Sequence, residues 1–367
     1  MAIKVLSVFG TRPEAIKMAP VVRALDEDPR FVSRVLVTAQ HREMLDQVLD
    51  FFSIRPDHDL NIMTQGQTLE QITSRALEGV GEVLRAERPD LVLVHGDTTT
   101  TFAATLAAFY EGIPVGHIEA GMRTGDRRQP FPEEINRTLV ARMTHYNFAP
   151  SDECVRNLER EDIDRERIIR TDHNTGIDSL LLARKLMEQQ GVVPEPTKHI
   201  LVTAHRRESW GEQMRGIFAA IADIAKARPD YHISLTTHAN PIVANDAHEI
   251  LADIPNVSLL DHQSYEEFIV LMAHSQLILT DSGGIQEEGP TLGIPVVVLR
   301  NMTEYNELLD EGVVFLAGTL REGIVAKALE VLDDPDVSVK VQSFAHDRAQ
   351  RSSIPAILDT LFQGIGH

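Results

Sequence analysis

The stretch "LILTDSGGIQEE", residues 277–288, joins an apolar run to a polar turn with two glycines and then to a segment suited to a helix. The stretch "LVLVHGDTTTT", residues 91–101, has the same layout, and after each of them Gly-Ile-Pro-Val leads into the next apolar run. A strand, a turn, a helix and a second strand in this order form a βαβ unit, which requires a parallel sheet. The repeated layout therefore predicts an α/β protein with parallel strands in both halves of the chain.

Short apolar runs of this kind recur along the whole chain. They lie at 3–9, 34–39, 90–96, 114–120, 146–150, 166–171, 199–204, 232–237, 257–261, 276–281 and 295–300. The runs are continuously apolar, as expected for strands that are covered by helices on both faces. Segments with helical spacing lie between them, among them 13–25, 43–52, 69–87 and 213–227.

The length and the breaks in the pattern indicate two domains. A chain of 367 residues suits two domains of ordinary size, and polar stretches rich in Pro and Gly lie at 171–178 and 189–198. We expect two Rossmann-like doubly wound domains facing a central cleft, at 1–171 and 172–345, and a C-terminal helix at 346–367 that packs back on the first domain. Ligands of such sheets bind beyond the carboxyl ends of the strands.

The composition argues against several classes of function. With 35 Lys and Arg against 55 Asp and Glu, the net charge is −20, whereas a nucleic-acid-binding protein needs a basic face. No apolar run approaches the ~18 residues that span a membrane, and the first ten residues are strand-like rather than a signal peptide. The single cysteine, Cys154, leaves no disulfide framework and no cysteine-rich metal site. We therefore expect a cytoplasmic protein.

Two cations follow the first strand. Arg12 and Lys17 lie at the start of a helix, where positive charge opposes the helix dipole, so they indicate an anionic ligand. Gly10 before them is expected to allow a tight turn.

Three carboxylates follow strands of the first domain. Asp97 comes after the third strand, as an N-cap or as a functional group, and Glu119 follows the fourth. Glu133 begins the helix after the 121–132 loop, with Arg137 one turn further on. Crowded carboxylates raise one another's pKa and supply general acids and bases, although the sequence leaves open which of the three is the base.

Strand ends of the second domain carry cationic groups and a glycine turn. His205 and Arg206 follow one strand, His238 the next, and Ser282-Gly283-Gly284 a third. Asp-Ser-Gly-Gly also surrounds the nucleophilic serine of trypsin-like proteases, but here the turn opens a helix, which favours a phosphate held at the helix N-terminus. No G-x-G-x-x-G follows a strand and no Walker A pattern occurs, so neither a nicotinamide cofactor nor a metal is expected.

Seven blocks of the sequence resemble the bacterial non-hydrolysing UDP-N-acetylglucosamine 2-epimerases and cover nearly the whole chain up to about residue 300. They are "VFGTRPEAIKMAPV", "TAQHREMLDQVL", "LVLVHGDTTTTFAA", "GIPVGHIEAGMRTG", "PFPEEINRTL", "VTAHRRES" and "LTDSGGIQEE". The resemblance implies a GT-B-like fold, usually in a homodimer. It also implies interconversion of UDP-GlcNAc and UDP-ManNAc by elimination of UDP to a bound 2-acetamidoglucal and its re-addition, without a cofactor.

The resemblance assigns roles by position. Matching catalytic positions are Lys17, Asp97, Glu119, Glu133 and His205. Matching substrate-binding positions are Arg12, Lys17, Arg137, His205, Arg206, His238, Phe268, Ser282, Gly283, Gly284 and Glu288, with Glu288 on the ribose and Phe268 near the uracil. A regulatory site known in some family members would include Gln40, His41 and Arg42.

The chain departs from the family pattern at the segment 343–353 before the last helix, and at Asp172-His173, Thr236-Thr237 and Tyr305-Asn306. The last of them replaces an arginine expected near the nucleotide. Four alternatives therefore stay open: an epimerase that hydrolyses its substrate to ManNAc and UDP, a 2-epimerase of another nucleotide sugar, a glycosyltransferase, and a catalytically silent nucleotide-sugar sensor.

Overall fold

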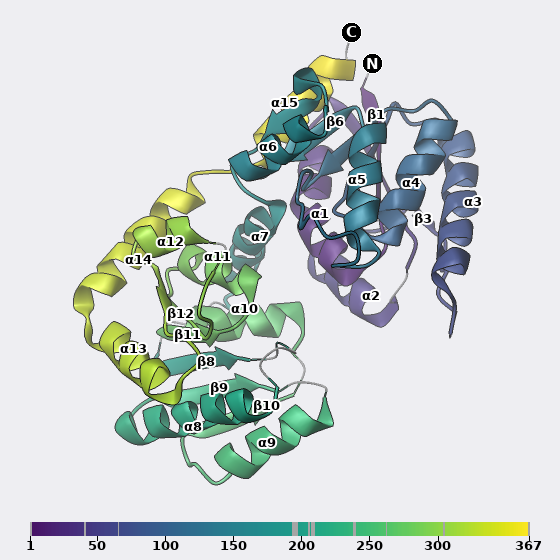
Figure 1. Cartoon of the computed structure of the whole chain (residues 1–367). Helices are drawn as coiled ribbons and strands as arrows, with labels where there is room; N and C mark the ends of the chain where they lie inside the picture. The colour runs from purple at the N-terminus through teal and green to yellow at the C-terminus, as the bar shows by residue number, and fades with distance from the viewer. Residues whose placement is uncertain are drawn as a thin grey trace. The chain divides into compact units, whose positions relative to one another are not determined.

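The computed structural model describes residues 2–39, 42–64, 66–192, 197–204, 206, 210–237, 240–261, 263–303 and 305–365 (Figure 1). By its contacts the chain divides into two compact units. Unit 1 comprises Met1–Leu182 and Ser352–His367, and unit 2 comprises Ala183–Arg351.

Unit 1 contains a sheet of seven parallel strands in the order β3-β2-β1-β4-β5-β6-β7. The strands are β1 (Ile3–Phe9), β2 (Phe31–Val37), β3 (His58–Asp59), β4 (Leu91–His95), β5 (Val115–Ile118), β6 (Tyr146–Ala149) and β7 (Ile168–Arg170). One hydrophobic core of this unit includes the strand residues Leu6, Val8, Leu36, Val92 and Val94, all fully buried.

Helices cover both faces of this sheet, because right-handed crossovers after β1 and after β4 lead to opposite faces. In one layer α1 (Arg12–Glu27) packs against α2 (Arg42–Phe51) and α15 (Ile354–Ile365). In the other, α4 (Thr99–Tyr110) packs between α3 (Leu69–Glu87) and α5 (Glu133–Met143). The remaining helices of this part are α6 (Asp152–Arg160), η1 (Arg165–Arg167) and α7 (Thr175–Gln189).

Unit 2 contains a sheet of six parallel strands in the order β10-β9-β8-β11-β12-β13. The strands are β8 (His199–Thr203), β9 (His232–Thr236), β10 (Val257–Leu260), β11 (Leu277–Thr280), β12 (Val296–Val298) and β13 (Val314–Leu316). Its helices are α8 (Glu212–Ala227), α9 (Pro241–Leu251), α10 (Tyr265–His274), α11 (Gly283–Thr291), α12 (Asn306–Asp310), α13 (Arg321–Asp333) and α14 (Pro335–Ala349). Within the unit α8 packs against α9 and α13, and α11 packs against α14.

The two sheets have the same doubly wound topology. In unit 1 the order of strands reverses between β1 and β4, and in unit 2 it reverses between β8 and β11. Such a reversal opens a crevice at the carboxyl ends of the two central strands, which is where doubly wound proteins bind their ligands. The predicted α/β class with two Rossmann-like sheets is confirmed.

All the predicted strands are present, but the prediction missed β3 and β13. Both are edge strands, of two and three residues. The polar pair that forms β3 has no hydrophobic pattern, whereas β13 lies in a short apolar run at 313–317 that the prediction overlooked. The division into units also differs from the expected boundaries. It falls at 182/183 rather than 171/172, because the expected break at 171–178 contains the start of α7, and at 351/352 rather than 345/346, because α14 continues to Ala349.

No helix in the described part of the chain is long and apolar enough to span a membrane.

Candidate active site

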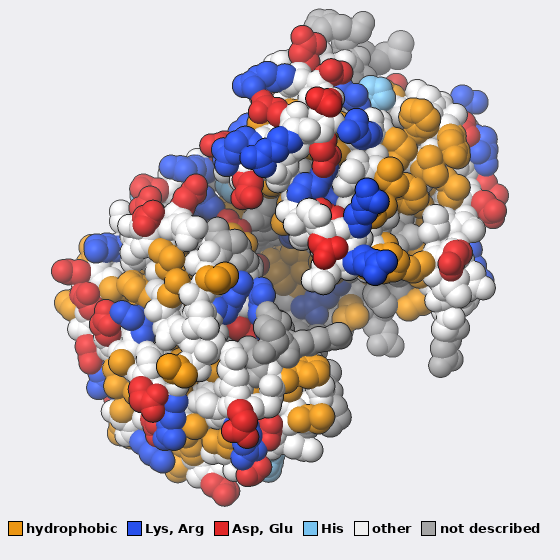
Figure 2. Space-filling model, viewed as in Figure 1, with side chains coloured by type: hydrophobic (Ala, Val, Ile, Leu, Met, Phe, Trp, Pro, Cys, Tyr) orange, Lys and Arg blue, Asp and Glu red, His pale blue; other side chains and the backbone are white. Residues whose placement is uncertain are grey.

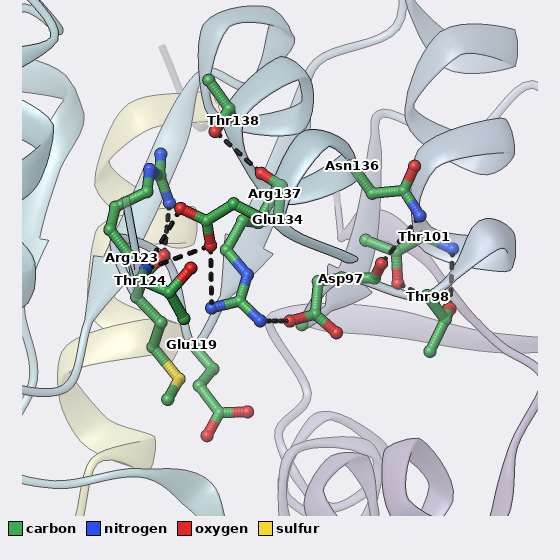
Figure 3. A network of polar contacts seen from close by, with 12 residues as sticks. Asp97, Thr98, Thr101, Glu119, Arg123, Thr124, Glu134, Asn136, Arg137 and Thr138 are labelled. Carbon is green, nitrogen blue, oxygen red and sulfur yellow. Dashed lines mark hydrogen bonds and ion pairs between the residues drawn. The ribbon is translucent and has the colours of Figure 1, made fainter. Parts of the chain in front are cut away.

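Arg137 joins two carboxylates at the start of α5 (Figure 3). Its Nη2 lies 2.5 Å from Asp97 Oδ2, and its Nη1 lies 3.6 Å from Glu134 Oε2. The neighbouring Asn136 donates a hydrogen bond of 2.9 Å from its amide nitrogen to the backbone carbonyl of Asp97. The first turn of α5 therefore fixes both the backbone and the side chain of Asp97 at the carboxyl end of β4.

Lys17 of α1 forms an ion pair with Glu119, the residue that follows β5. The Lys17 Nζ lies 2.7 Å from both carboxylate oxygens, and His95 Nε2, at the end of β4, lies 2.9 Å from Glu119 Oε2. Glu119 has a φ of +64°. A non-glycine residue in this left-handed region costs free energy and is found preferentially at functional positions.

The surroundings shift the pKa values of the two carboxylates in opposite directions. Burial opposes the ionisation of Glu119, but Lys17 and then His95 outweigh it, so the pKa of Glu119 is lowered. Burial raises the pKa of Asp97 above its ordinary value; Arg137 lowers it in part, and the charges of Glu119 and Glu133 add to the increase. Opposite shifts of neighbouring carboxylates are a common basis for separate roles in one site.

Glu133 and Glu134 are adjacent in sequence but lie in different surroundings. Glu134 is buried, and its carboxylate accepts the backbone N–H groups of Thr124 and Gly125, which anchors the loop before α5. Glu133 is half-buried, and no hydrogen bond joins its carboxylate to any described residue. The structure thus brings Lys17, Asp97, Glu119, Glu133 and Arg137 to one edge of the sheet in unit 1, as the sequence predicted.

One local prediction for this edge is wrong. Thr98, rather than Asp97, is the N-cap of α4, and its hydroxyl accepts the N–H of Thr101. Gly10 lies in the tight two-residue turn between β1 and α1, as predicted, and it is also needed for close packing. A Cβ at this position would lie 2.0 Å from Thr38 Oγ1 and 2.6 Å from Thr100 Oγ1.

Arg12 is the first residue of α1 and is half-buried, beside the point where the strand order of the sheet reverses.

The sequence did not predict two further residues at this edge, His95 and Glu14. His95 could have been noticed as a polar residue that ends an apolar strand, directly before Gly96-Asp97. Glu14 gives no such signal, since an acidic residue in the first turn of a helix is ordinary.

His117 of β5 is a structural residue. It is fully buried, its Nε2 donates a hydrogen bond of 2.6 Å to the Gly96 carbonyl, and burial lowers its pKa to about 4. The neutral ring holds Gly96, with a φ of +68°, in the turn that leads to Asp97.

In unit 2, the residues after β8 and β11 lie next to each other. The backbone N–H of Arg206 donates to Asp281 Oδ2 at 2.9 Å, and Asp281 is completely buried. Ser282 is the N-cap of α11, but its side chain forms no capping hydrogen bond, so the first N–H groups of this helix are not satisfied by Ser282. A helix N-terminus of this kind favours an anion.

Glu288 and Phe268 were predicted to contact the nucleoside. Glu288 folds back toward the helix start, since a Cβ on Gly284 would lie 3.7 Å from its Oε1. Phe268 is half-buried on α10. Gly283 and Gly284 form the first turn of α11, as expected.

Several predicted positions lie outside the described residues: Gln40, His41, His205 and His238. Arg42, the remaining member of the expected regulatory set, contacts the carboxylates of Asp46 and Asp59. Within the described ranges, no group of three or more His, Cys, Asp and Glu side chains has an arrangement that could hold a metal ion.

Comparison with known proteins identifies the family. A family model described as UDP-N-acetylglucosamine 2-epimerase matches residues 23–358. UDP-N-acetylglucosamine 2-epimerase of Salmonella typhimurium is 52% identical over 355 residues, which cover 94% of each chain. The enzyme of the same name from Bacillus subtilis is 45% identical over 371 residues, covering 100% of this chain and 96% of that relative.

The fold agrees with the sequence comparison. The crystal structure of UDP-GlcNAc 2-epimerase from Neisseria meningitidis bound to UDP-GlcNAc is similar to this chain with a TM-score of 0.79 and 43% sequence identity, over 98% of this chain and 100% of that one. The match extends through both units and includes the strand ends described above. This chain therefore belongs to the UDP-N-acetylglucosamine 2-epimerase family.

Proposed function

We propose that this protein is a non-hydrolysing UDP-N-acetylglucosamine 2-epimerase, which interconverts UDP-GlcNAc and UDP-ManNAc by eliminating UDP and adding it back. The observation that carries the proposal is the pair of oppositely perturbed carboxylates in unit 1: Asp97 has a raised pKa and Glu119 a lowered one. UDP-GlcNAc as the substrate is supported by the similarity to the Neisseria meningitidis enzyme, whose structure contains it.

The proton on carbon 2 must leave from one face of the sugar and return to the other. A group that accepts and returns a proton needs a pKa closer to neutrality than that of an ordinary aspartate. Burial raises the pKa of Asp97 in this direction. Glu133 is the second proton-transfer group, because its carboxylate has no hydrogen-bond donor among the described residues that would hold it in another role. Inversion at carbon 2 through the glycal is the step that these two groups would perform.

Glu119 has a different role in this proposal. Its carboxylate is held by Lys17 at 2.7 Å and stays ionised, so it is a poor acceptor of the substrate proton. Its negative charge instead raises the pKa of Asp97 and fixes the position of the Lys17 ammonium group. Lys17 then supplies positive charge at the site.

UDP leaves with additional negative charge, which must be met by cations and N–H donors that are already in place. In unit 2 these are the N–H groups at the start of α11, after Ser282, together with Arg206 and the predicted His205. Glu288 would bind the ribose and Phe268 would contact the uracil. In unit 1, Arg12 and Arg137 add positive charge.

Product analysis tests the proposal. The purified protein is incubated with UDP-GlcNAc alone, and the nucleotide and sugar products are separated. The proposal predicts a mixture of UDP-GlcNAc and UDP-ManNAc with no accumulation of free sugar. Free ManNAc with equimolar UDP would assign the hydrolysing type, and turnover only with an added acceptor would assign a glycosyltransferase. A panel of other nucleotide sugars identifies a different substrate, and binding without turnover identifies a sensor.

A homodimer is the assembly that we propose. Hydrophobic side chains gather on the α4 and α5 side of unit 1 (Figure 2), where Phe109, Tyr110 and Leu139 are 57%, 68% and 44% exposed. Exposed apolar residues that gather on neighbouring helices mark interaction surfaces, and a two-fold dimer needs only one such self-complementary surface. Light scattering of the wild type and of the double variant Phe109→Glu/Tyr110→Glu checks this assembly: a dimer and a monomer, respectively, are expected.

A cytoplasmic location also stays part of the proposal, supported by the single cysteine.

A further inference from the structure

Glu14 is almost fully buried, with 2% of its surface exposed, and its carboxylate accepts hydrogen bonds from three donors. Its Oε2 accepts the backbone N–H groups of Gly10 at 3.1 Å and Thr11 at 2.8 Å. Its Oε1 accepts the hydroxyl of Thr98 at 2.7 Å and lies 3.1 Å from the hydroxyl oxygen of Thr101. No ion pair with a described cation accompanies these contacts.

These donors belong to two different loops. Gly10 and Thr11 connect β1 to α1, directly before Arg12, whereas Thr98 is the N-cap of α4, directly after Asp97. The strands β1 and β4 are the two strands between which the order of the sheet reverses. One carboxylate therefore joins the two loops on either side of the reversal point.

Helix capping alone accounts for only part of this arrangement. A glutamate at the third position of a helix commonly accepts the N–H of the N-cap residue, here Thr11. The contacts to Gly10, Thr98 and Thr101 lie outside that motif. The Thr98 hydroxyl is fixed from both sides, since it accepts the Thr101 N–H and donates to Glu14.

We propose that Glu14 is a positioning residue for the reaction: by holding the Thr98 hydroxyl to the loop of Gly10 and Thr11, it sets where Asp97 stands relative to Arg12. This inference rests on the proposed epimerase function. Glu14 itself does not contact the sugar, because its carboxylate is buried and occupied by the two loops.

The variant Glu14→Gln distinguishes the bonds to the backbone of Gly10 and Thr11 from the bond to the Thr98 hydroxyl. An amide has one acceptor oxygen and one donor nitrogen, whereas Gly10, Thr11 and Thr98 all donate to the Glu14 carboxylate. Glutamine can accept from the backbone pair, as in many capping boxes, but its NH₂ group then faces the Thr98 hydroxyl. The helix cap is kept, and the hydrogen bond that the Thr98 hydroxyl donates to the carboxylate is lost.

Two further variants, both at Thr98, test the hydrogen bond between Thr98 and Glu14 from the Thr98 side. Thr98→Ala removes the hydroxyl, and Thr98→Ser restores it with the same donor and acceptor. Gln71→Ala is the matched control, since Gln71 is the equivalent capping-box residue of α3 and its side chain accepts the N–H of Thr68 at the start of its own helix.

The measurements are kcat for deuterium exchange at carbon 2 of UDP-GlcNAc, expressed per UDP-binding site from calorimetric titration, and KM. We expect Glu14→Gln and Thr98→Ala to lower kcat by about 10- to 100-fold, as for a small misplacement of a reacting group, with KM changed by less than about threefold. Thr98→Ser and Gln71→Ala should keep kcat close to the wild-type value. A purely structural Glu14 would instead lower the number of binding sites or the melting temperature and leave kcat per site unchanged, which would overturn the proposal. So would a Thr98→Ser variant as slow as Thr98→Ala.

Amide hydrogen exchange separates a failure of this inference from a failure of the proposed function. If the wild type shows no exchange at carbon 2 of UDP-GlcNAc, the proposed function is wrong, and the amide rates alone decide on Glu14. Faster exchange of the Thr101 N–H in Glu14→Gln, with the Thr11 N–H still protected, supports the connection between the loops. Faster exchange at Thr11 alone contradicts it.

Discussion

Lys17 and Glu119 form a short ion pair at one edge of the first sheet: the Lys17 ammonium nitrogen lies 2.7 Å from each carboxylate oxygen. The pair joins α1 to the residue that follows β5, which holds Glu119 in its left-handed backbone conformation. Because Glu119 is only 10% exposed, the pair is shielded from solvent on the carboxylate side. Its ionisation therefore affects both the stability and the chemistry of unit 1.

The first prediction concerns the pH dependence of stability. The pKa of Glu119 is lowered in the folded state, so its ionisation stabilises the fold above its unfolded pKa of about 4.3, and this stabilisation is lost as the pH falls toward the lowered value. The difference in melting temperature between the wild type and Glu119→Gln should accordingly shift against the wild type between pH 5 and pH 3. A difference that is constant across this range would show that the carboxylate does not titrate with folding.

The pH profile of the reaction should depend on Arg137. Arg137 lowers the pKa of Asp97, so Arg137→Met raises that pKa, and the acidic limb of kcat/KM moves to higher pH. Asp97→Asn should reduce exchange at carbon 2 by about 10²- to 10⁴-fold, the usual contribution of a general base. Arg142→Met, which removes an exposed arginine from the last turn of the same helix, is the control and should leave the limb in place. A limb unmoved in Arg137→Met contradicts the assignment of Asp97.

The adjacent residues Glu133 and Glu134 should give opposite results. Glu134 accepts two backbone N–H groups in a buried position, so Glu134→Gln should lower the free energy of unfolding by about 1–3 kcal/mol. Glu133 is half-buried without a hydrogen bond to a described residue, so Glu133→Gln should change stability by less than about 0.5 kcal/mol while exchange at carbon 2 falls sharply. Chemical denaturation and the exchange assay check both variants. Normal exchange in Glu133→Gln would refute its role in proton transfer.

Gly284 tests the nucleotide site of unit 2. A Cβ there would lie 3.7 Å from the Glu288 carboxylate, an ordinary contact distance, so Gly284→Ala should fold and remain as stable as the wild type or more so, by up to about 1 kcal/mol. The added methyl group would, however, lie beside the N–H groups proposed to hold a phosphate, and UDP affinity measured by calorimetry should fall about tenfold. The matched control is Gly216→Ala in α8, where a Cβ meets nothing within 4 Å. Equal UDP affinity in the two variants would argue against a phosphate at this helix start.

The sequence predicted the parallel sheets and most residues at their carboxyl ends, because continuous apolar runs followed by polar turns are a local signal. Asp97 and Glu119 could be found in this way, since each lies within two residues of a strand end, and Lys17 could be found as a cation early in the helix that follows β1. The short strand β3 could not, since His58 and Asp59 have no hydrophobic pattern. The boundary between the units was misplaced because α7 runs through it without an interruption that the sequence would show.

The residues that the sequence did not reveal are those whose role comes from packing. His95 ends an apolar run and reads as part of a strand; its position 2.9 Å from Glu119 depends on the pairing of β4 with β5. Glu14 has the sequence pattern of an ordinary helix start, and its three donors come together only when β1 and β4 are neighbours. Side-chain direction and burial at such positions follow from tertiary structure.

The most direct test of the epimerase assignment is to incubate the protein with UDP-GlcNAc in deuterated water and follow carbon 2 by NMR. The assignment predicts that the carbon-2 proton signal of UDP-GlcNAc disappears while UDP-ManNAc carrying deuterium at carbon 2 accumulates, with the sugar–phosphate bond intact in the products. Retention of the carbon-2 proton, or the release of free ManNAc and UDP in place of UDP-ManNAc, would contradict it.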